Sequence, residues 1–78
     1  MGIYEFNVLS EQNQYDIVFT KGTFVDSIQN GNVKFVLYSV HMFWVEIIYE
    51  ESINKISGLK SFLTGEILNK YSNVPNNF

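Results

Sequence analysis

The sequence predicts an α+β domain, a four-stranded antiparallel β-meander flanked by a short N-terminal helix and a short C-terminal helix. Three observations predict this fold. Residues 33–51 are dense in β-branched and aromatic side chains, Asn30-Gly31 is a strong hairpin signal, and suitable capping residues precede two helical segments. The 78 residues are expected to form a single small domain, with an ordered core over about 10–71 and a frayed tail over 72–78.

The first helix is predicted over 11–21. Ser10 is a suitable N-cap, and Gly22 occupies the position where a left-handed residue would end the helix. Some apolar residues of this segment also alternate as they would in a strand, namely Tyr15, Ile17 and Phe19. A strand over the same residues is therefore the alternative.

The first hairpin is predicted at Asn30-Gly31, after a strand over 23–29, because both turn residues accept positive φ. A two-residue turn there pairs Ile28 with Val33. A three-residue loop over 30–32 would instead turn Ile28 to the other face of the sheet, since strand side chains alternate. The sequence leaves both registers open.

The run from Val33 to Glu51 is predicted to fold back at His41-Met42, because it is too long for a strand of about 3–10 residues. One face of the resulting hairpin is expected to form the core: Val36, Tyr38, Val40, Phe43, Val45, Ile47 and Tyr49. The opposite face carries Val33, Phe35, Leu37, Ser39, Trp44, Glu46, Ile48 and Glu50. That face is too apolar to be a simple solvated surface, so something must cover much of it.

A third turn is predicted around Asn54, a residue that can take the left-handed conformation. It leads into a strand over about 55–62, so that Glu50 and Lys55 face each other across the turn. A last short helix is predicted over 65–71. The alternative is one longer helix through both segments, which would have to contain two glycines at about 1 kcal/mol each relative to alanine.

Composition argues against several classes of function. The chain has no cysteine, so it can form neither disulfides nor thiolate metal sites. It has no arginine, its five lysines are scattered and its net charge is -3, so nucleic acid is not an expected partner. The N-terminal residues lack the pattern of a signal peptide, and no apolar stretch approaches the roughly 20 residues of a membrane span. We therefore expect a cytoplasmic protein that needs no cofactor and does not bind membranes.

Several short segments make up a frame of core and turn positions: G-T-F at 22–24, L-Y-S at 37–39, F-W-V-E-I-I-Y at 43–49, N-K-I at 54–56, and Leu68 with Tyr71. This frame, which covers roughly 22–71, resembles a group of short uncharacterised bacterial proteins. The resemblance implies a compact domain and no activity, and it carries over no functional residue. Those proteins often have glycine just before the aromatic start of the third strand, where this chain has His41 and Met42.

Candidate catalytic groups are few. His41 is the only histidine, and a single histidine without cysteine or suitably spaced carboxylates does not make a transition-metal site, so it is interpreted as a turn residue. Ser39, His41 and Glu46 lack the G-x-S-x-G elbow and the glycine-rich loop of a hydrolase. Glu46 interrupts an apolar strand and is interpreted as a structural carboxylate, because no second catalytic group accompanies it.

The sequence does not identify a function. The hypothesis that fits it best is a small non-catalytic protein-interaction module, which forms a homodimer or binds another protein through an apolar face of the sheet. The residues expected at this interface are Phe35, Leu37, Trp44 and Ile48. The alternative is a small-molecule-binding domain, or a minor enzyme, with a pocket near Trp44, Glu46 and His41. No catalytic, metal-binding or cofactor-binding residue is assigned.

Overall fold

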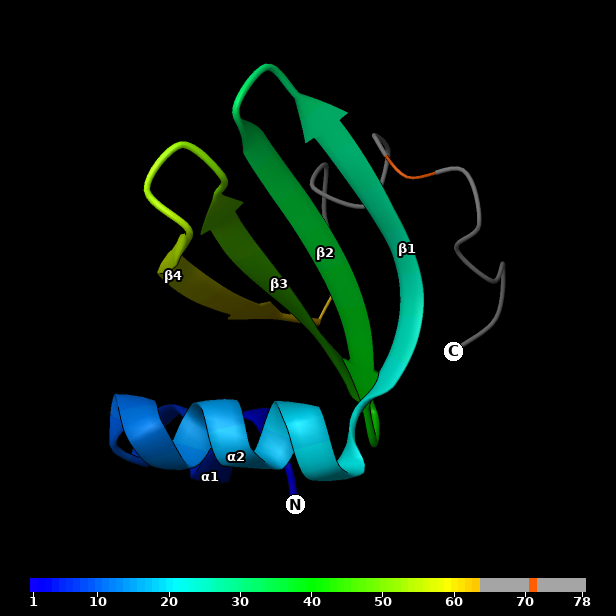
Figure 1. Ribbon diagram of the computed structural model, residues 1–78. Helices are drawn as coiled ribbons and strands as arrows, with labels where there is room; N and C mark the ends of the chain where they lie inside the picture. Colours follow the sequence, from blue (N-terminus) through cyan, green and yellow to red (C-terminus); the bar gives the residue numbers. More distant parts are fainter. Residues whose placement is uncertain (64–70, 72–78) are drawn as a thin grey trace.

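The computed structural model describes residues 1–63 and Tyr71 and contains two short helices followed by a four-stranded antiparallel sheet (Figure 1). The elements are α1 (Ile3–Asn7), α2 (Glu11–Lys21), β1 (Thr23–Asn30), β2 (Val33–Val40), β3 (Phe43–Glu50) and β4 (Lys55–Phe62). The strands follow the order β1-β2-β3-β4, which confirms the predicted meander. The helix predicted over 65–71 lies outside the described residues apart from Tyr71, and so does the tail over 72–78.

The helix predicted over 11–21 is confirmed, and the alternative strand is wrong. The Ser10 hydroxyl oxygen caps it by accepting a hydrogen bond from the backbone N–H of Asn13 at 3.3 Å. Gly22, however, is not left-handed, since it has φ -77° and ψ 157°. A Cβ atom at Gly22 would lie 2.5 Å from the carbonyl oxygen of Val18. Glycine therefore serves a close backbone approach at this position, and positive φ is not required.

Helix α1 precedes residue 10, where the ordered core was expected to begin. Its Phe6 is fully buried, and the ring centroid lies 5.2 Å from that of Phe43 in β3. The side-chain amide of Gln14 in α2 donates a 3.0 Å hydrogen bond to the carbonyl oxygen of Phe6. Ser61 of β4 donates to the side-chain oxygen of Asn7. α1 is thus packed against both α2 and the sheet.

Two of the three hairpin registers are as predicted. β2 and β3 pair in the register set by a two-residue turn at 41–42, where His41 adopts φ 51°. β3 and β4 pair with Glu50 opposite Lys55, and Asn54 adopts φ 54° in the turn between them. Histidine and asparagine are among the residues that tolerate positive φ best, which explains why these turns form without glycine.

The first hairpin differs from both registers considered. β1 and β2 are joined by Gly31 and Asn32, and Ile28 pairs with Phe35. The predicted two-residue turn at Asn30-Gly31 and the three-residue loop are therefore both wrong. Gly31 has φ 63°, the backbone conformation that favours glycine, whereas Asn30 stays in β1. Of Asn30 and Gly31, which can both adopt positive φ, only Gly31 does so.

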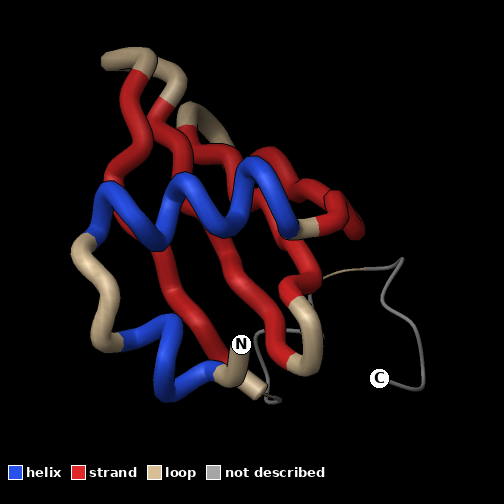
Figure 2. The backbone as a smooth tube through the Cα atoms, turned by 90° about the horizontal axis from the view of Figure 1, so that it is seen from below, coloured by secondary structure: helices blue, strands red, loops and turns tan. Residues whose placement is uncertain are grey.

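The sheet has two apolar faces. On the face that carries the helices, here called the helix-side face, the buried core comprises Phe6, Val18, Val40, Phe43, Val45 and Ile47. On the opposite face, here called the second face, Leu37 and Trp44 are buried together with Tyr71. Figure 2 shows α2 crossing the strands on one side of the sheet. The second face, which is too apolar to be a simple solvated surface, is thus packed against Tyr71 of the same chain.

Candidate functional site

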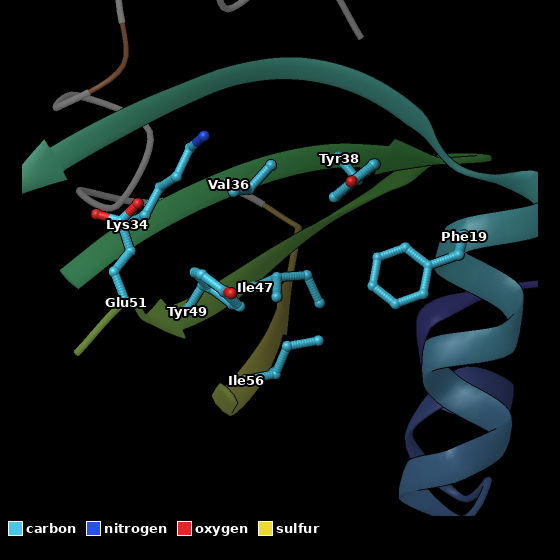
Figure 3. A pocket seen from close by; sticks show the side chains of 8 residues that line it. All are labelled: Phe19, Lys34, Val36, Tyr38, Ile47, Tyr49, Glu51 and Ile56. Atoms are coloured by element: carbon cyan, nitrogen blue, oxygen red, sulfur yellow. The ribbon is translucent and has the colours of Figure 1, made fainter. Parts of the chain in front are cut away.

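A pocket of about 250 Å³ lies on the helix-side face, between α2 and the far end of the strands (Figure 3). We call it the helix-side groove. Phe19 projects toward it from α2 at one end, while Lys34 and Glu51 lie at the other end. The residues that line it are Phe19, Lys34, Val36, Tyr38, Ile47, Tyr49, Glu51 and Ile56. They come from α2, from the strands β2, β3 and β4, and from the turn that follows β3.

The groove exists because α2 is too thin to cover the sheet. A helix with its side chains is about 10–12 Å across, whereas a strand of eight residues is about 26 Å long. α2 crosses the strands near one end (Figure 1), so part of the helix-side face remains uncovered. Two apolar residues at the border of this open area keep considerable exposed surface, Phe19 with 52% and Ile56 with 38%.

The walls of the groove are apolar and aromatic. Val36 and Ile47 are paired across β2 and β3 and form its floor. The rings of Phe19 and Tyr38 meet edge to face, with centroids 5.9 Å apart and planes at 81°. The hydroxyl of Tyr49 donates a hydrogen bond to the side-chain oxygen of Asn54. The contacts of these two tyrosines hold their rings in place at the sides of the groove.

One end of the groove is charged. Lys34 pairs with Tyr49 across β2 and β3. Glu51 follows β3, and its backbone N–H donates a 2.8 Å hydrogen bond to the carbonyl oxygen of Asn32. The Glu51 carboxylate accepts a hydrogen bond from the side-chain amide of Gln29, which also donates to the carbonyl oxygen of Gly31 at 2.8 Å. Contacts from β1 and the first turn therefore hold this carboxylate.

A different polar arrangement lies buried on the second face. Glu46 is only 2% exposed, and its Oε2 accepts a 2.7 Å hydrogen bond from the hydroxyl of Tyr71. Burial, reinforced by this hydrogen bond, by the charge of Glu46 and by the charge of Asp26, raises the pKa of Tyr71 well above its usual value. Asp26 belongs to the same face, because it pairs with Leu37, which in turn pairs with Glu46. The tyrosine therefore stays protonated and donates to the carboxylate.

The residues expected at an interface lie together on the second face. Leu37 and Trp44 have only 0% and 2% of their surface exposed within the single chain. Phe35 and Ile48 are half-buried and paired with each other across β2 and β3. The two central members of the expected interface are therefore already covered by the chain itself.

The alternative pocket near Trp44, Glu46 and His41 is not the groove. None of the three lines it. His41 is exposed in the turn between β2 and β3, whereas Trp44 and Glu46 are buried on the second face. Within residues 1–63 and Tyr71, no group of three or more histidine, aspartate and glutamate side chains could hold a metal ion.

The groove was not predicted from the sequence. The residues of its floor and walls fall mostly in the expected core, and none of Phe19, Lys34, Glu51 and Ile56 was expected at a binding site. A signal was available, because a predicted helix of 11 residues cannot cover one whole face of four strands of eight residues. Which part of the face remains open depends on where the helix crosses, and this follows only from the tertiary packing.

The arrangement is suited to binding. It combines an apolar floor, aromatic walls and two opposite charges at one end, the typical composition of a site that holds an apolar group and orients a polar one.

No helix in the described part of the chain is both long enough and apolar enough to cross a membrane. Comparisons with protein-family models, curated proteins and solved structures give no match for this chain. The fold and the groove define a small α+β domain with a partly open sheet face.

Proposed function

We propose that this chain is a small non-catalytic binding module and that its binding site is the helix-side groove. The observation that carries the proposal is the apolar and aromatic pocket of about 250 Å³ that α2 leaves open on the sheet. Water in contact with such a surface is released when an apolar group enters, which favours binding by about 25 cal/mol per Å² of apolar surface removed from water.

A binding role is favoured over catalysis by the position of the titratable groups. His41 is exposed in a turn away from the groove, and Glu46 is buried on the other face with Tyr71. The groove itself contributes an ammonium group, a carboxylate and two phenols. These groups can hold and orient a molecule, but they include no nucleophile paired with a base in the manner of known hydrolases.

The groove is also a better candidate interface than the face expected from the sequence. Self-association through Phe35, Leu37, Trp44 and Ile48 would require Tyr71 to leave its buried place against Leu37 and Trp44. An apolar side chain of a partner protein, or of a second copy of this chain, would instead find the groove already open. Self-association of this chain is therefore proposed to use the helix-side face.

The test uses two exposed isoleucines as a matched pair. Ile56→Glu places a charge in the groove wall, whereas Ile53→Glu places the same charge in a turn outside it, at 56% exposure. We expect the neutral apolar probe indole to shift backbone NMR signals of the groove residues in the wild type and in Ile53→Glu, and to bind much more weakly to Ile56→Glu. Equal binding to both variants, or shifts outside the groove, would refute the proposal.

Sedimentation of the same three proteins over a range of concentrations tests self-association. A dimer that is lost in Ile56→Glu and kept in Ile53→Glu would place the homodimer interface at the groove. A dimer that persists in both variants but is lost on substitution of Phe35 would show that the chain self-associates through the second face.

A further inference from the structure

We infer that the helix-side groove binds a free α-amino acid with a large apolar side chain. This inference rests on the proposed function and names the chemical class of the ligand. It comes from the separation of the groove into an apolar part near α2 and a charged end near the first turn.

The apolar part accepts one side chain of moderate size. The pocket volume of about 250 Å³ is slightly below the roughly 300–1,000 Å³ of sites for drug-sized ligands. Phe19 and Tyr38 form an edge-to-face corner, and Val36 with Ile47 forms the floor. An aromatic ring of the ligand can pack against that corner in the offset or edge-to-face geometry that aromatic groups prefer.

The charged end matches a zwitterion. Lys34 and Glu51 bring opposite charges to the same end of the groove (Figure 3). The carboxylate of Glu51 is held by Gln29, and the Glu51 backbone is held by Asn32, so its position does not depend on a ligand. An α-amino acid carries its ammonium and carboxylate groups on one carbon, next to the side chain, and so presents both charges at one end of an apolar group.

Ligands with a single charge fit this end less well. An apolar carboxylic acid would pair with Lys34 but would bring a second negative charge beside Glu51. An apolar amine would pair with Glu51 but would be repelled by Lys34. A neutral apolar molecule would gain binding free energy only from contact with the floor and walls. Of these ligands, only the zwitterion brings an opposite charge to both Lys34 and Glu51 while its side chain fills the apolar part.

The first experiment compares four probes by NMR titration of the wild-type protein. The probes are L-phenylalanine, 3-phenylpropionate, which lacks the ammonium group, 2-phenylethylamine, which lacks the carboxylate, and glycine, which lacks the ring. We expect L-phenylalanine to bind most tightly. Each analogue that lacks one charge should bind up to about fivefold more weakly, the usual effect of one exposed ion pair. Glycine is expected to show no measurable binding.

The second experiment assigns the two charges. Lys34→Gln is expected to weaken the binding of L-phenylalanine without weakening the binding of 2-phenylethylamine, which has no carboxylate. Glu51→Gln is expected to weaken the binding of L-phenylalanine without weakening the binding of 3-phenylpropionate, which has no ammonium group. Lys60→Gln is the control, because Lys60 is exposed, does not line the groove and pairs with Glu46 of the second face. It should leave all affinities unchanged.

The outcomes separate this inference from the proposed function. If indole binds in the groove while L-phenylalanine binds no more tightly than its two singly charged analogues, the amino-acid inference is wrong and the binding module stands. If neither indole nor L-phenylalanine shifts the groove signals, both are wrong. Binding of L-phenylalanine that is equally weakened by Lys60→Gln would also overturn the inference, since a general charge effect would then explain it.

Discussion

The hydroxyl of Tyr71 donates a 2.7 Å hydrogen bond to Oε2 of Glu46, a residue that lies 25 positions earlier in the chain and is buried on the second face of the sheet. The bond joins the one buried polar side chain among the described residues to the apolar cluster of Leu37 and Trp44. A carboxylate buried among apolar groups needs such a partner, because burial of an unsatisfied charge is costly. Tyr71 therefore has two roles, since it covers Trp44 and donates to Glu46.

The first prediction concerns this hydrogen bond. Tyr71→Phe keeps the ring but removes the donor, and we expect it to lower the free energy of unfolding by about 1.5–3 kcal/mol, the usual range for a hydrogen bond to a charged group. Tyr4→Phe is the control, because Tyr4 is 82% exposed and its change should stay within about 0.5 kcal/mol. Urea unfolding of both variants is the measurement. Equal stability of the two would show that the bond contributes nothing.

The second prediction is a pH dependence with a definite sign. The pKa of Tyr71 is raised in the folded protein, mainly by burial, so the folded state keeps a proton that the unfolded state loses above the ordinary tyrosine pKa of 10.0. The contribution of the protonated Tyr71 to the free energy of unfolding is therefore complete below about pH 10. It declines as the pH rises further, by at most about 1.4 kcal/mol per pH unit.

Comparison with Tyr71→Phe isolates this effect. The pKa of Tyr15 is also raised, by burial and by the charge of Glu11, but that tyrosine is present in both proteins and its contribution cancels. We expect the wild type to lose more stability than the variant between about pH 9 and about pH 11. Parallel losses in the two proteins would contradict the assignment.

The third prediction tests whether α1 is part of the core. Phe6 is fully buried against Phe43, so Phe6→Ala should cost about 3–5 kcal/mol. Such a loss is large for a small domain, so Phe6→Leu, which keeps most of the apolar volume, provides a variant that remains folded and loses less. Val8→Ala is the control at 84% exposure. Val8→Ala should unfold at the temperature of the wild type. If Phe6→Leu also unfolded at that temperature, α1 would not be packed as described.

The fourth prediction concerns the turn between β2 and β3. His41 adopts φ 51°, a conformation that costs a residue with a side chain about 1–2 kcal/mol, whereas glycine adopts it freely. His41→Gly should therefore leave the protein as stable as the wild type or raise its stability by up to about 1 kcal/mol. Met42→Gly, at the neighbouring exposed position, should lower stability by about 0.5–1 kcal/mol. Thermal unfolding measures both, and a loss in His41→Gly as large as in Met42→Gly would contradict the strain argument.

Local features of the sequence were sufficient for much of the fold. The alternation of apolar residues around His41-Met42 predicts the β2–β3 register, because a strand side chain can face only one of two sides. The capping residue Ser10 predicts the start of α2, and Asn54 predicts the third turn, because each depends on the conformation of a few neighbouring residues. These predictions required no knowledge of distant contacts.

The sequence by itself determined the hairpin of β2 and β3, its register and the presence of two apolar sheet faces. It left a strand open for 11–21 and a longer helix open for the segment that begins at 55. Only the tertiary structure decided the first hairpin register, the packing of α1 through Phe6, the burial of Trp44 under Tyr71 and the position of the open groove beside Phe19. The physical reason is the range of the interactions. Backbone propensity and side-chain alternation act between neighbouring residues, whereas the cover of each sheet face depends on contacts between segments far apart in the chain. The candidate site belongs to the second group, because the groove is the part of the helix-side face that α2 does not reach.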